Sequence, residues 1–210
     1  MGVTTTLINK PFNPRAQDAS PLAYNRAALY SGKALDFDGV NDKITTNLNT
    51  TIFSDSGTMS AYLNIDGLVG IKAGFGFRLG NTSEFYFLSV NNNSEFRLRT
   101  TGGVTDVVTN LSEFVGRWTL FTCTFGGGLM SLYADDNLIA SNNYTGDFMS
   151  SASSNYVFGE SGGNSFWYDG QASNVKVFNT ALTPAQIADL YNFPEKIVPT
   201  GVDNTALKLW

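Results

Sequence analysis

The chain has 210 residues, of which 13 are basic and 18 acidic, and its formal net charge is −5 at neutral pH. No run of Lys or Arg is present, which argues against a protein that binds nucleic acid by neutralising its phosphates. The sequence contains no histidine, so Ser-His-Asp catalysis, Cys-His catalysis and the usual transition-metal sites are excluded.

The composition favours one all-β domain with a sizeable core. Hydrophobic residues make up 42% of the chain and include 16 Phe and 9 Tyr. The 21 glycines, together with many Asn, Ser and Thr, favour strands and turns over helices. Cys123 is the only cysteine, so no disulfide can form within the chain, and its place in a strand-like run predicts a buried, unreactive thiol.

The first 30 residues differ from the rest. They contain Pro11, Pro14 and Pro21 and few paired apolar positions, which predicts an extended N-terminal arm over residues 1–30. The arm lacks the long apolar stretch of a signal peptide, and no segment of the chain is long and apolar enough to span a bilayer. We therefore expect no membrane insertion.

Period-two alternation begins at Ala34. Leu35 and Phe37 alternate with acidic residues, Gly39 opens a turn, and residues 59–66 alternate regularly, which predicts a strand with one buried and one solvated face. Short strands separated by Gly, Asn and Asp predict an all-β fold, a two-sheet antiparallel β-sandwich or jelly roll. The other predicted strands cover residues 43–46, 68–72, 75–79, 84–90, 95–101, 104–109, 117–125, 129–135, 137–141, 155–159 and 171–179.

One short helix is predicted near the C-terminal end, over residues 183–191. Thr183 is a suitable N-cap, Pro184 suits the first turn, and Gln186 completes a capping box. The tail, residues 193–210, contains two prolines and ends on an apolar ALKLW segment. This segment resembles a strand that pairs either with this domain or with another chain.

Three blocks of sequence together resemble a known superfamily. They are ALDFDGVNDKITT, RWTLFTCTFGGGLMSLYADDNLIAS and GQASNVKVFNTALTPAQIADLYN. In this order they are similar to the laminin-G-like, concanavalin A-like jelly-roll domains, and the resemblance covers residues 31–192. It implies a binding or structural module, because only a minority of the superfamily are glycosidases and many members belong to cell-surface and phage virion proteins.

A calcium site is a first candidate. Many members of the superfamily hold a structural calcium near the F-D-G turn, and this turn concentrates the oxygen ligands that calcium requires. The alternative is a solvated turn in which Asp and Asn bind backbone N–H groups. The acidic pair that the last long strand of the family often carries is replaced here by Ser173 and Asn174. The predicted calcium ligands are Asp36, Asp38, Asn41, Asp42 and Asp169.

Glycoside hydrolysis is a second candidate, and the sequence argues against it. The reaction needs two carboxyl groups that flank one bond, and related glucanases carry an E-x-D-x-x-E pattern. The chain has Glu only at positions 84, 95, 113, 160 and 195, and none begins that pattern. We therefore predict a protein without enzymatic activity.

Carbohydrate binding is a third candidate, since lectin sites combine exposed aromatic rings with polar neighbours. The alternative is that these rings pack in the core or across strands. The predicted carbohydrate contacts are Tyr62, Arg97, Arg99, Trp167 and Tyr168, with Tyr86 as a further candidate.

These observations favour a phage virion surface protein: a decoration, fibre or tail component that adheres to glycans. The expected partners are other virion proteins or copies of the chain itself, bound through the N-terminal arm and the C-terminal tail, and also surface glycans. The expected location is the virion surface. The alternative is a secreted or cell-surface carbohydrate-binding module that is one domain of a longer protein.

Overall fold

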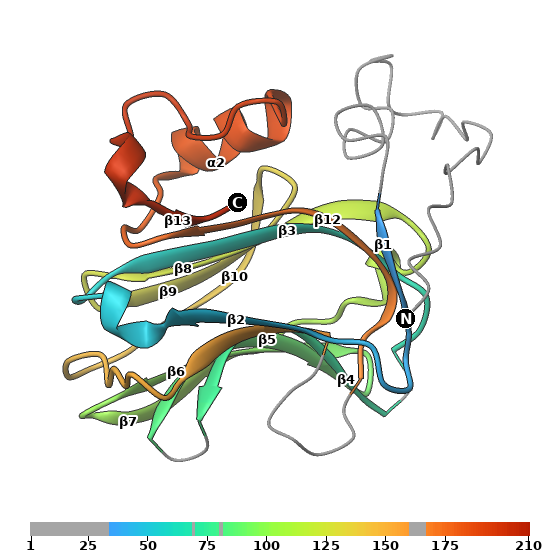
Figure 1. The fold of residues 1–210 in the computed structure, drawn as a ribbon, viewed down its shortest axis with the longest axis horizontal. Helices are drawn as coiled ribbons and strands as arrows, with labels where there is room; N and C mark the ends of the chain where they lie inside the picture. The colour runs from blue at the N-terminus through green and yellow to red at the C-terminus, as the bar shows by residue number, and fades with distance from the viewer. Residues whose placement is uncertain (1–33, 69, 80–81, 160–166) are drawn as a thin grey trace.

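The computed structural model describes residues 34–68, 70–79, 82–159 and 167–210, and two antiparallel sheets lie face to face in it (Figure 1). The predicted arm, residues 1–30, lies outside the described residues. Sheet A contains, in spatial order, β1 (Leu35–Asp38), β12 (Asp169–Phe178), β3 (Gly57–Ile65), β8 (Trp118–Gly126), β9 (Leu129–Ala134) and β10 (Asn137–Asn143), and β13 (Leu207–Leu209) also pairs with β12. Sheet B contains β2 (Ile44–Asn49), β11 (Asn155–Phe158), β4 (Ile71–Leu79), β5 (Ser83–Val90), β6 (Asn93–Thr100) and β7 (Gly103–Val107).

Helix α2 (Pro184–Asn192) lies over the outer face of sheet A (Figure 1). The predicted fold class, an all-β sandwich with one short C-terminal helix, is confirmed. The predicted capping box is present as well: the Thr183 hydroxyl accepts a hydrogen bond from the Gln186 backbone N–H, and the Gln186 side chain accepts one from the Thr183 N–H.

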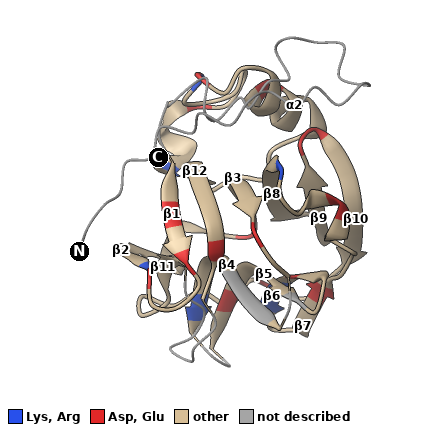
Figure 2. Cartoon of the chain, turned by 90° about the vertical axis from the view of Figure 1, so that its right-hand side faces the viewer, with Lys and Arg blue, Asp and Glu red and all other residues tan. Residues whose placement is uncertain are grey.

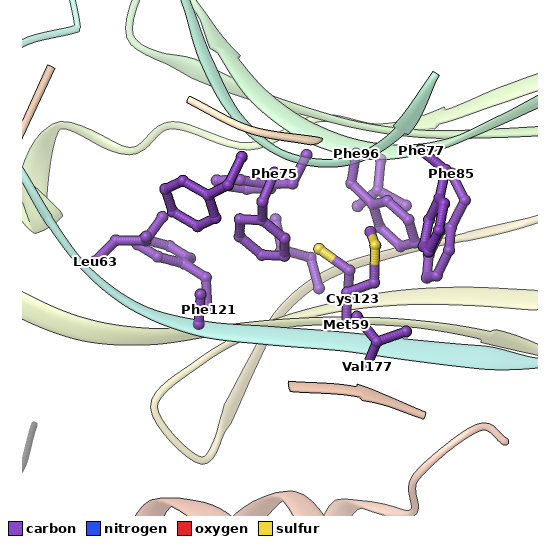
Figure 3. Packing of buried hydrophobic residues seen from close by; sticks show 14 of the residues in the cluster. Met59, Leu63, Phe75, Phe77, Phe85, Phe96, Phe121, Cys123 and Val177 are labelled. Carbon is purple, nitrogen blue, oxygen red and sulfur yellow. The ribbon is translucent and has the colours of Figure 1, made fainter. Parts of the chain in front are cut away.

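The main core fills the space between the sheets and is dominated by phenylalanine (Figure 3). Phe85 is fully buried, and its ring centroid lies 4.8 Å from that of Phe125 and 5.4 Å from that of Phe53. Cys123 is buried in the same core, as predicted, and this burial raises the pKa of its thiol well above the ordinary value. Interlocked aromatic rings of this kind contribute both buried area and directional ring contacts.

Strand β3 is buried on both faces, so the prediction of a solvated face over residues 59–66 was wrong. The cause is a second apolar cluster between sheet A and α2, in which Tyr62 and Leu120 from the sheet meet Ile187 and Leu190 from the helix. Period-two alternation shows only that the two faces of a strand differ. It does not reveal which face a distant helix covers.

The strands predicted over residues 68–72 and 75–79 meet in a single strand, β4, which begins at Ile71. Its two internal glycines do not end the strand, because they allow close approach of β5. A Cβ atom added at Gly74 would lie 2.5 Å from the Phe87 carbonyl oxygen, and one added at Gly76 would lie 2.5 Å from the Phe85 carbonyl oxygen. The register also shifts between Ala73 and Phe75, which is typical of a glycine-containing bulge.

The tail packs on its own domain. Strand β13 pairs with β12, with Leu209 opposite Val177 and Leu207 opposite Phe178. Val198 and Val202 also pack against the cluster beneath α2. Of the two pairings that the sequence left open for this segment, the structure shows the one within the same chain.

Lys176 is the one lysine among the fully buried large side chains of the described chain. It lies on β12 beneath the tail, is 2% exposed, and its Nζ donates a hydrogen bond to the Lys196 carbonyl oxygen at 2.8 Å. Burial lowers the pKa of Lys176 to about 8, an effect that the negative charge of Glu195 partly opposes. The charged ammonium therefore costs stability at neutral pH.

We predict that the Lys176→Met variant, which has no buried charge at this position, reveals the cost as a pH-dependent difference in unfolding free energy from the wild type. The wild-type protein loses the cost between about pH 8 and pH 10, because the unfolded chain still binds the proton there while the folded chain releases it. The variant has no such transition. The difference in unfolding free energy between the Lys176→Met variant and the wild type should therefore shrink by about 2 kcal/mol over this range. Urea denaturation at both pH values measures it, and a difference that does not change with pH would contradict the assignment.

Candidate functional site

One end of the sandwich brings together the turn after β1 and the start of β12. Asp38 and Asp169 are directly opposite in the β1–β12 register. Between them the turn passes through Gly39, whose φ of +72° is left-handed, and a Cβ added there would lie 3.1 Å from Asp169 Cβ and Cγ. The backbone N–H of Asp66, just after β3, donates to the Asp169 carbonyl oxygen at 3.2 Å. Figure 2 shows acidic positions on β1 and on the neighbouring β12.

The carboxylates of the turn hold its backbone. Asp38 Oδ1 accepts hydrogen bonds from the backbone N–H of Val40 at 2.8 Å and of Asn41 at 3.3 Å. Asp42 Oδ2 accepts one from the backbone N–H of Asp38 at 3.1 Å. These local bonds are what Asp provides in tight turns, and they fix the position of the residues that follow.

An aromatic ring and a cation lie beside this turn. The Nζ atom of Lys43, an exposed side chain, lies 6.0 Å from the centroid of the Trp167 ring, and the tryptophan is partly exposed. This distance is at the outer limit of a cation–π contact. A partly exposed indole ring with a cation and several carboxylates nearby is a surface on which a sugar ring can stack.

Tyr168 lies in the core next to the site and is not part of its surface. It is 2% exposed, and its hydroxyl lies 3.0 Å from the Gln171 carbonyl oxygen and 3.2 Å from that of Asn64. Burial raises the pKa of the Tyr168 phenol well above its ordinary value, and the negative charges of Asp66, Asp169 and Asp36 raise it further. The same carboxylates make this end of the sandwich electronegative.

Arg97 and Arg99 lie on the outer face of sheet B and are engaged in ion pairs. Arg97 Nε and Nη2 donate to the two carboxylate oxygens of Asp106 at 2.7 and 2.9 Å. Arg99 Nε donates to Glu84 Oε2 at 2.8 Å. The hydrogen bond to Asp106 raises the pKa of Arg97 above its ordinary value. The predicted arginine contacts to sugar therefore act in the structure as cross-strand pairs.

Tyr86 is covered by the same network. It is 3% exposed, and its ring centroid lies 5.0 Å from the guanidinium group of Arg78 and 5.8 Å from that of Arg97. Its hydroxyl donates a hydrogen bond to Glu95 at 2.9 Å. Burial is the largest cause that raises the pKa of this phenol, and Glu95 adds to it. The ring is not presented to a ligand.

Tyr62 is likewise absent from the surface. It is 2% exposed beneath α2, and its hydroxyl donates to the Tyr191 carbonyl oxygen at 3.3 Å. The interpretation of Tyr62 and Tyr168 as exposed sugar contacts is corrected by their burial. Of the predicted aromatic contacts, Trp167 is the one that remains partly exposed.

The structure brings the predicted calcium residues to one end of the molecule but gives them no ion cage. Among the described residues, no group of three or more His, Cys, Asp or Glu side chains is arranged to hold a metal ion. Asp38 and Asp42 instead bind backbone N–H groups within the turn. The calcium site stays a prediction that the described geometry does not favour.

The backbone hydrogen bonds that Asp38 and Asp42 accept within the turn lead us to expect no effect of calcium on stability. A structural ion binds the folded state alone, so its removal would lower the melting temperature. We expect the same melting temperature, within about 1 °C, in excess EGTA and in millimolar calcium. A rise of several degrees with calcium, but not with magnesium, would restore the calcium prediction.

Sequence reasoning missed Lys43 and Asp66 as parts of this site. Lys43 follows Asp42 in the turn, but its neighbour Trp167 lies far away in the sequence, and no local pattern connects them. Asp66 directly follows β3, so its position at the end of the predicted alternating run, residues 59–66, was the one available signal. Both residues lie at the site because β1, β12 and β3 are neighbouring strands in sheet A, which cannot be seen from the sequence near either residue.

Comparisons with known proteins agree with this fold. A family model described as the concanavalin A-like lectin/glucanases superfamily matches residues 38–188. No curated protein sequence matches the chain. Within the described residues, α2 is too short to cross a bilayer, and no other helix there qualifies.

Several solved structures resemble the chain. The binding domain of Paraclostridial Mosquitocidal Protein 1 has 16% identity and a TM-score of 0.64, over 77% of this chain and 44% of that one. The binding domain of botulinum neurotoxin serotype D has 19% identity and a TM-score of 0.62, over 75% and 42%. A heptameric SAP-like pentraxin from Limulus polyphemus has 15% identity and a TM-score of 0.53, over 74% and 80%. The chain thus spans less than half the length of the two toxin domains, and at these identities the similarity concerns the fold.

Proposed function

Because the chain belongs to the concanavalin A-like lectin/glucanase superfamily, we propose that it is a binding module that attaches to surface carbohydrate. The proposed sugar site is the end of the sandwich at Trp167. The observation that carries the proposal is the partly exposed indole ring beside Lys43, next to the acidic turn that follows β1. Sheet B offers no comparable surface among its described residues, since its exposed-side arginines and Tyr86 are paired with one another and with carboxylates.

The chemistry of this end favours a neutral sugar. The apolar face of a pyranose ring can stack on the indole, while its hydroxyls donate to carboxylate oxygens and accept from the ammonium group. Asp36, Asp66 and Asp169 concentrate negative charge here, as their common effect on Tyr168 shows. A sialylated or sulfated glycan would be repelled by this charge.

We also propose that the module does not hydrolyse its ligand. Two of the glutamates that could serve in such a reaction, Glu84 and Glu95, are engaged with Arg99 and with Tyr86 and Arg97. The solved structures that resemble the chain include proteins whose titles name binding and receptor-binding domains. These observations support binding without turnover.

The proposed setting is a virion surface, with a secreted or cell-surface carbohydrate-binding module as the alternative. Both settings need a stable domain with one end available to a glycan-covered surface, and the folded sandwich supports either of them. Proteomic analysis of purified virus particles and of washed cell envelopes from the source distinguishes the two, because each setting predicts the chain in one fraction.

A glycan array tests the proposed ligand class. We expect the full chain to bind a subset of neutral glycans and to give signals at least about fivefold lower on their sialylated counterparts, equivalent to about 1 kcal/mol. Binding to none of the neutral glycans, or a preference for the sialylated ones, would contradict the proposal.

A further inference from the structure

The sequence contains three Asp-Gly pairs, and the fold brings all three to one end of the sandwich. They are Asp38-Gly39 in the turn after β1, Asp66-Gly67 directly after β3, and Asp169-Gly170 at the start of β12. Asp38 is opposite Asp169 in the β1–β12 register, and the Asp66 backbone N–H donates to the Asp169 carbonyl oxygen at 3.2 Å. Asp-Gly is the dipeptide that least hinders a reaction of the chain with itself, because glycine has no side chain and reaches backbone conformations that other residues avoid.

In this reaction the backbone nitrogen of the glycine attacks the carboxyl carbon, Cγ, of the preceding aspartate. A C–N bond forms, the bond from Cγ to the carboxyl hydroxyl breaks, and the hydroxyl leaves as water with the proton of the attacking nitrogen. Water then opens the cyclic imide that results. Cleavage at Cγ restores aspartate, whereas cleavage at the main-chain carbonyl carbon leaves isoaspartate, whose main chain runs through Cγ. The attack requires the aspartate to turn its ψ angle away from the extended value of a strand, so a strand ladder slows it.

The pair at Asp169 is held inside sheet A. Both of its residues belong to β12, which lies between β1 and β3. Gly170 is opposite Phe37 on one side and Ile65 on the other. A Cβ atom added to Gly170 would collide with the Asn64 carbonyl oxygen. The neighbouring strands therefore leave this backbone little room to turn.

The pair at Asp38 is held by hydrogen bonds of the turn. Asp38 is the last residue of β1, and its backbone N–H donates to Asp42 Oδ2. Its own carboxylate accepts hydrogen bonds from the backbone N–H groups of Val40 and Asn41. An attack by the Gly39 nitrogen on this carboxyl group has to break those bonds first.

The pair at Asp66 lacks these restraints. Asp66 is exposed and lies outside β3, and a Cβ atom added at Gly67 would meet no atom within 4 Å. Within the described part of the chain, neither the Asp66 carboxylate nor the Gly67 N–H makes a hydrogen bond. We propose that Asp66 is a site of spontaneous isoaspartate formation, and that it is the one of the three pairs at which the folded protein permits the reaction.

The conversion changes the end of the sandwich without changing its net charge. The main chain gains one carbon between Asp66 and Gly67, and the carboxylate that is left free is the former main-chain carboxyl group. A negative charge therefore stays next to Asp169 but takes a new position. The modification itself does not depend on sugar binding.

Peptide mapping with electron-transfer fragmentation tests the proposal, because it quantifies isoaspartate at each pair after the full chain is incubated at mildly acidic pH. The same incubation in guanidinium chloride gives the rate of each pair without the fold. Local opening that costs about 1.4 kcal/mol already slows a reaction tenfold. Relative to these unfolded rates, we expect Asp66 to convert at least about tenfold faster than Asp38 and Asp169 in the folded chain. A relative rate at Asp66 no higher than at the other two would overturn the proposal.

Two variants test the imide route at this position. Gly67→Ala adds a methyl group in open space but hinders the attacking nitrogen, and Asp66→Glu keeps the charge but has to close a larger ring. Each should slow conversion at position 66 at least about tenfold, with an unchanged melting temperature and unchanged conversion at Asp38 and Asp169. Hydroxylamine, which cleaves a chain at a cyclic imide, should cut the incubated wild type after Asp66. Conversion that is as fast in both variants, or that occurs without this cleavage, would overturn the proposal.

Discussion

Replacement of Phe85 by Ala should lower the free energy of unfolding by about 3–5 kcal/mol, the usual cost of removing a large aromatic side chain from a core. Phe85 is fully buried at the centre of the sandwich (Figure 3). Its ring contacts those of Phe53, Phe96 and Phe125, with centroids 4.8 to 5.7 Å apart. The remaining rings come from β6, β8 and the loop before β3, so they cannot collapse into the space without moving both sheets.

The loss is a large share of the stability of a domain of this size, which is typically about 5–15 kcal/mol. Phe193→Ala is the matched control, since that ring is 48% exposed and contacts the Lys196 ammonium at 4.7 Å. We expect it to cost about 1 kcal/mol or less. Chemical denaturation of both variants measures the two values, and similar losses would show that Phe85 does not lie at the centre of the aromatic core.

Replacement of Gly76 by Ala should destabilise the protein by about 4 kcal/mol, the sum of backbone strain and a steric clash. Gly76 has a φ of +141°, a conformation that side chains disfavour, and an added Cβ would lie 2.5 Å from both the Phe85 carbonyl oxygen and Tyr86 Cα. The colliding atoms belong to the backbone of the neighbouring strand, so no side-chain rotation relieves the clash.

Two other glycines separate these two effects. Gly103 has a φ of +119° but open space around its Cβ position, so Gly103→Ala measures strain alone. A Cβ added at Gly74 would lie 2.5 Å from the Phe87 carbonyl oxygen, but Gly74 does not have such a positive φ. Gly74→Ala therefore measures the steric clash alone. We expect each to cost about 1–3 kcal/mol. A Gly76→Ala loss no larger than that of Gly103→Ala would contradict the close packing of β4 on β5.

The fold could be predicted from the sequence wherever its cause is local. The capping box at Thr183 and Gln186 is specified by four consecutive residues, and β8 and β9 follow the strands predicted over residues 117–125 and 129–135. The errors had non-local causes. The outward face of β3 is buried by a helix more than a hundred residues away in the chain, and Gly74 and Gly76 serve close strand contact rather than a chain break.

The candidate site shows the same division. The acidic turn could be predicted because Asp36, Asp38 and Asp42 are neighbours in the sequence, and the position of Asp169 opposite Asp38 agrees with that prediction. The burial of Tyr62 and the pairing of Arg97 with Asp106 depend on which elements the topology places side by side. The Lys43–Trp167 contact depends on it too, and this contact, rather than the acidic turn alone, now defines the proposed site.

The alternating charges of β6 could have been used to predict that its arginines form ion pairs with neighbouring strands. Arg97 and Asp106 are directly opposite in the β6–β7 register, and Arg99 pairs with Glu84 across the face of the sheet. Oppositely charged residues on consecutive predicted strands indicate cross-strand ion pairs. Such pairs stabilise a sheet face, and they leave its arginines less available to a ligand.

Isothermal titration of the strongest neutral array glycan into three forms of the full chain tests the central claim most directly. The forms are the wild type, Trp167→Ala and Trp210→Ala, the last being an equally large change at an exposed tryptophan outside the site. Loss of the stacking surface in Trp167→Ala should weaken binding about tenfold, equivalent to about 1.4 kcal/mol, while Trp210→Ala should bind as the wild type does. Equal affinity of the wild type and a folded Trp167→Ala variant would contradict the proposed sugar site.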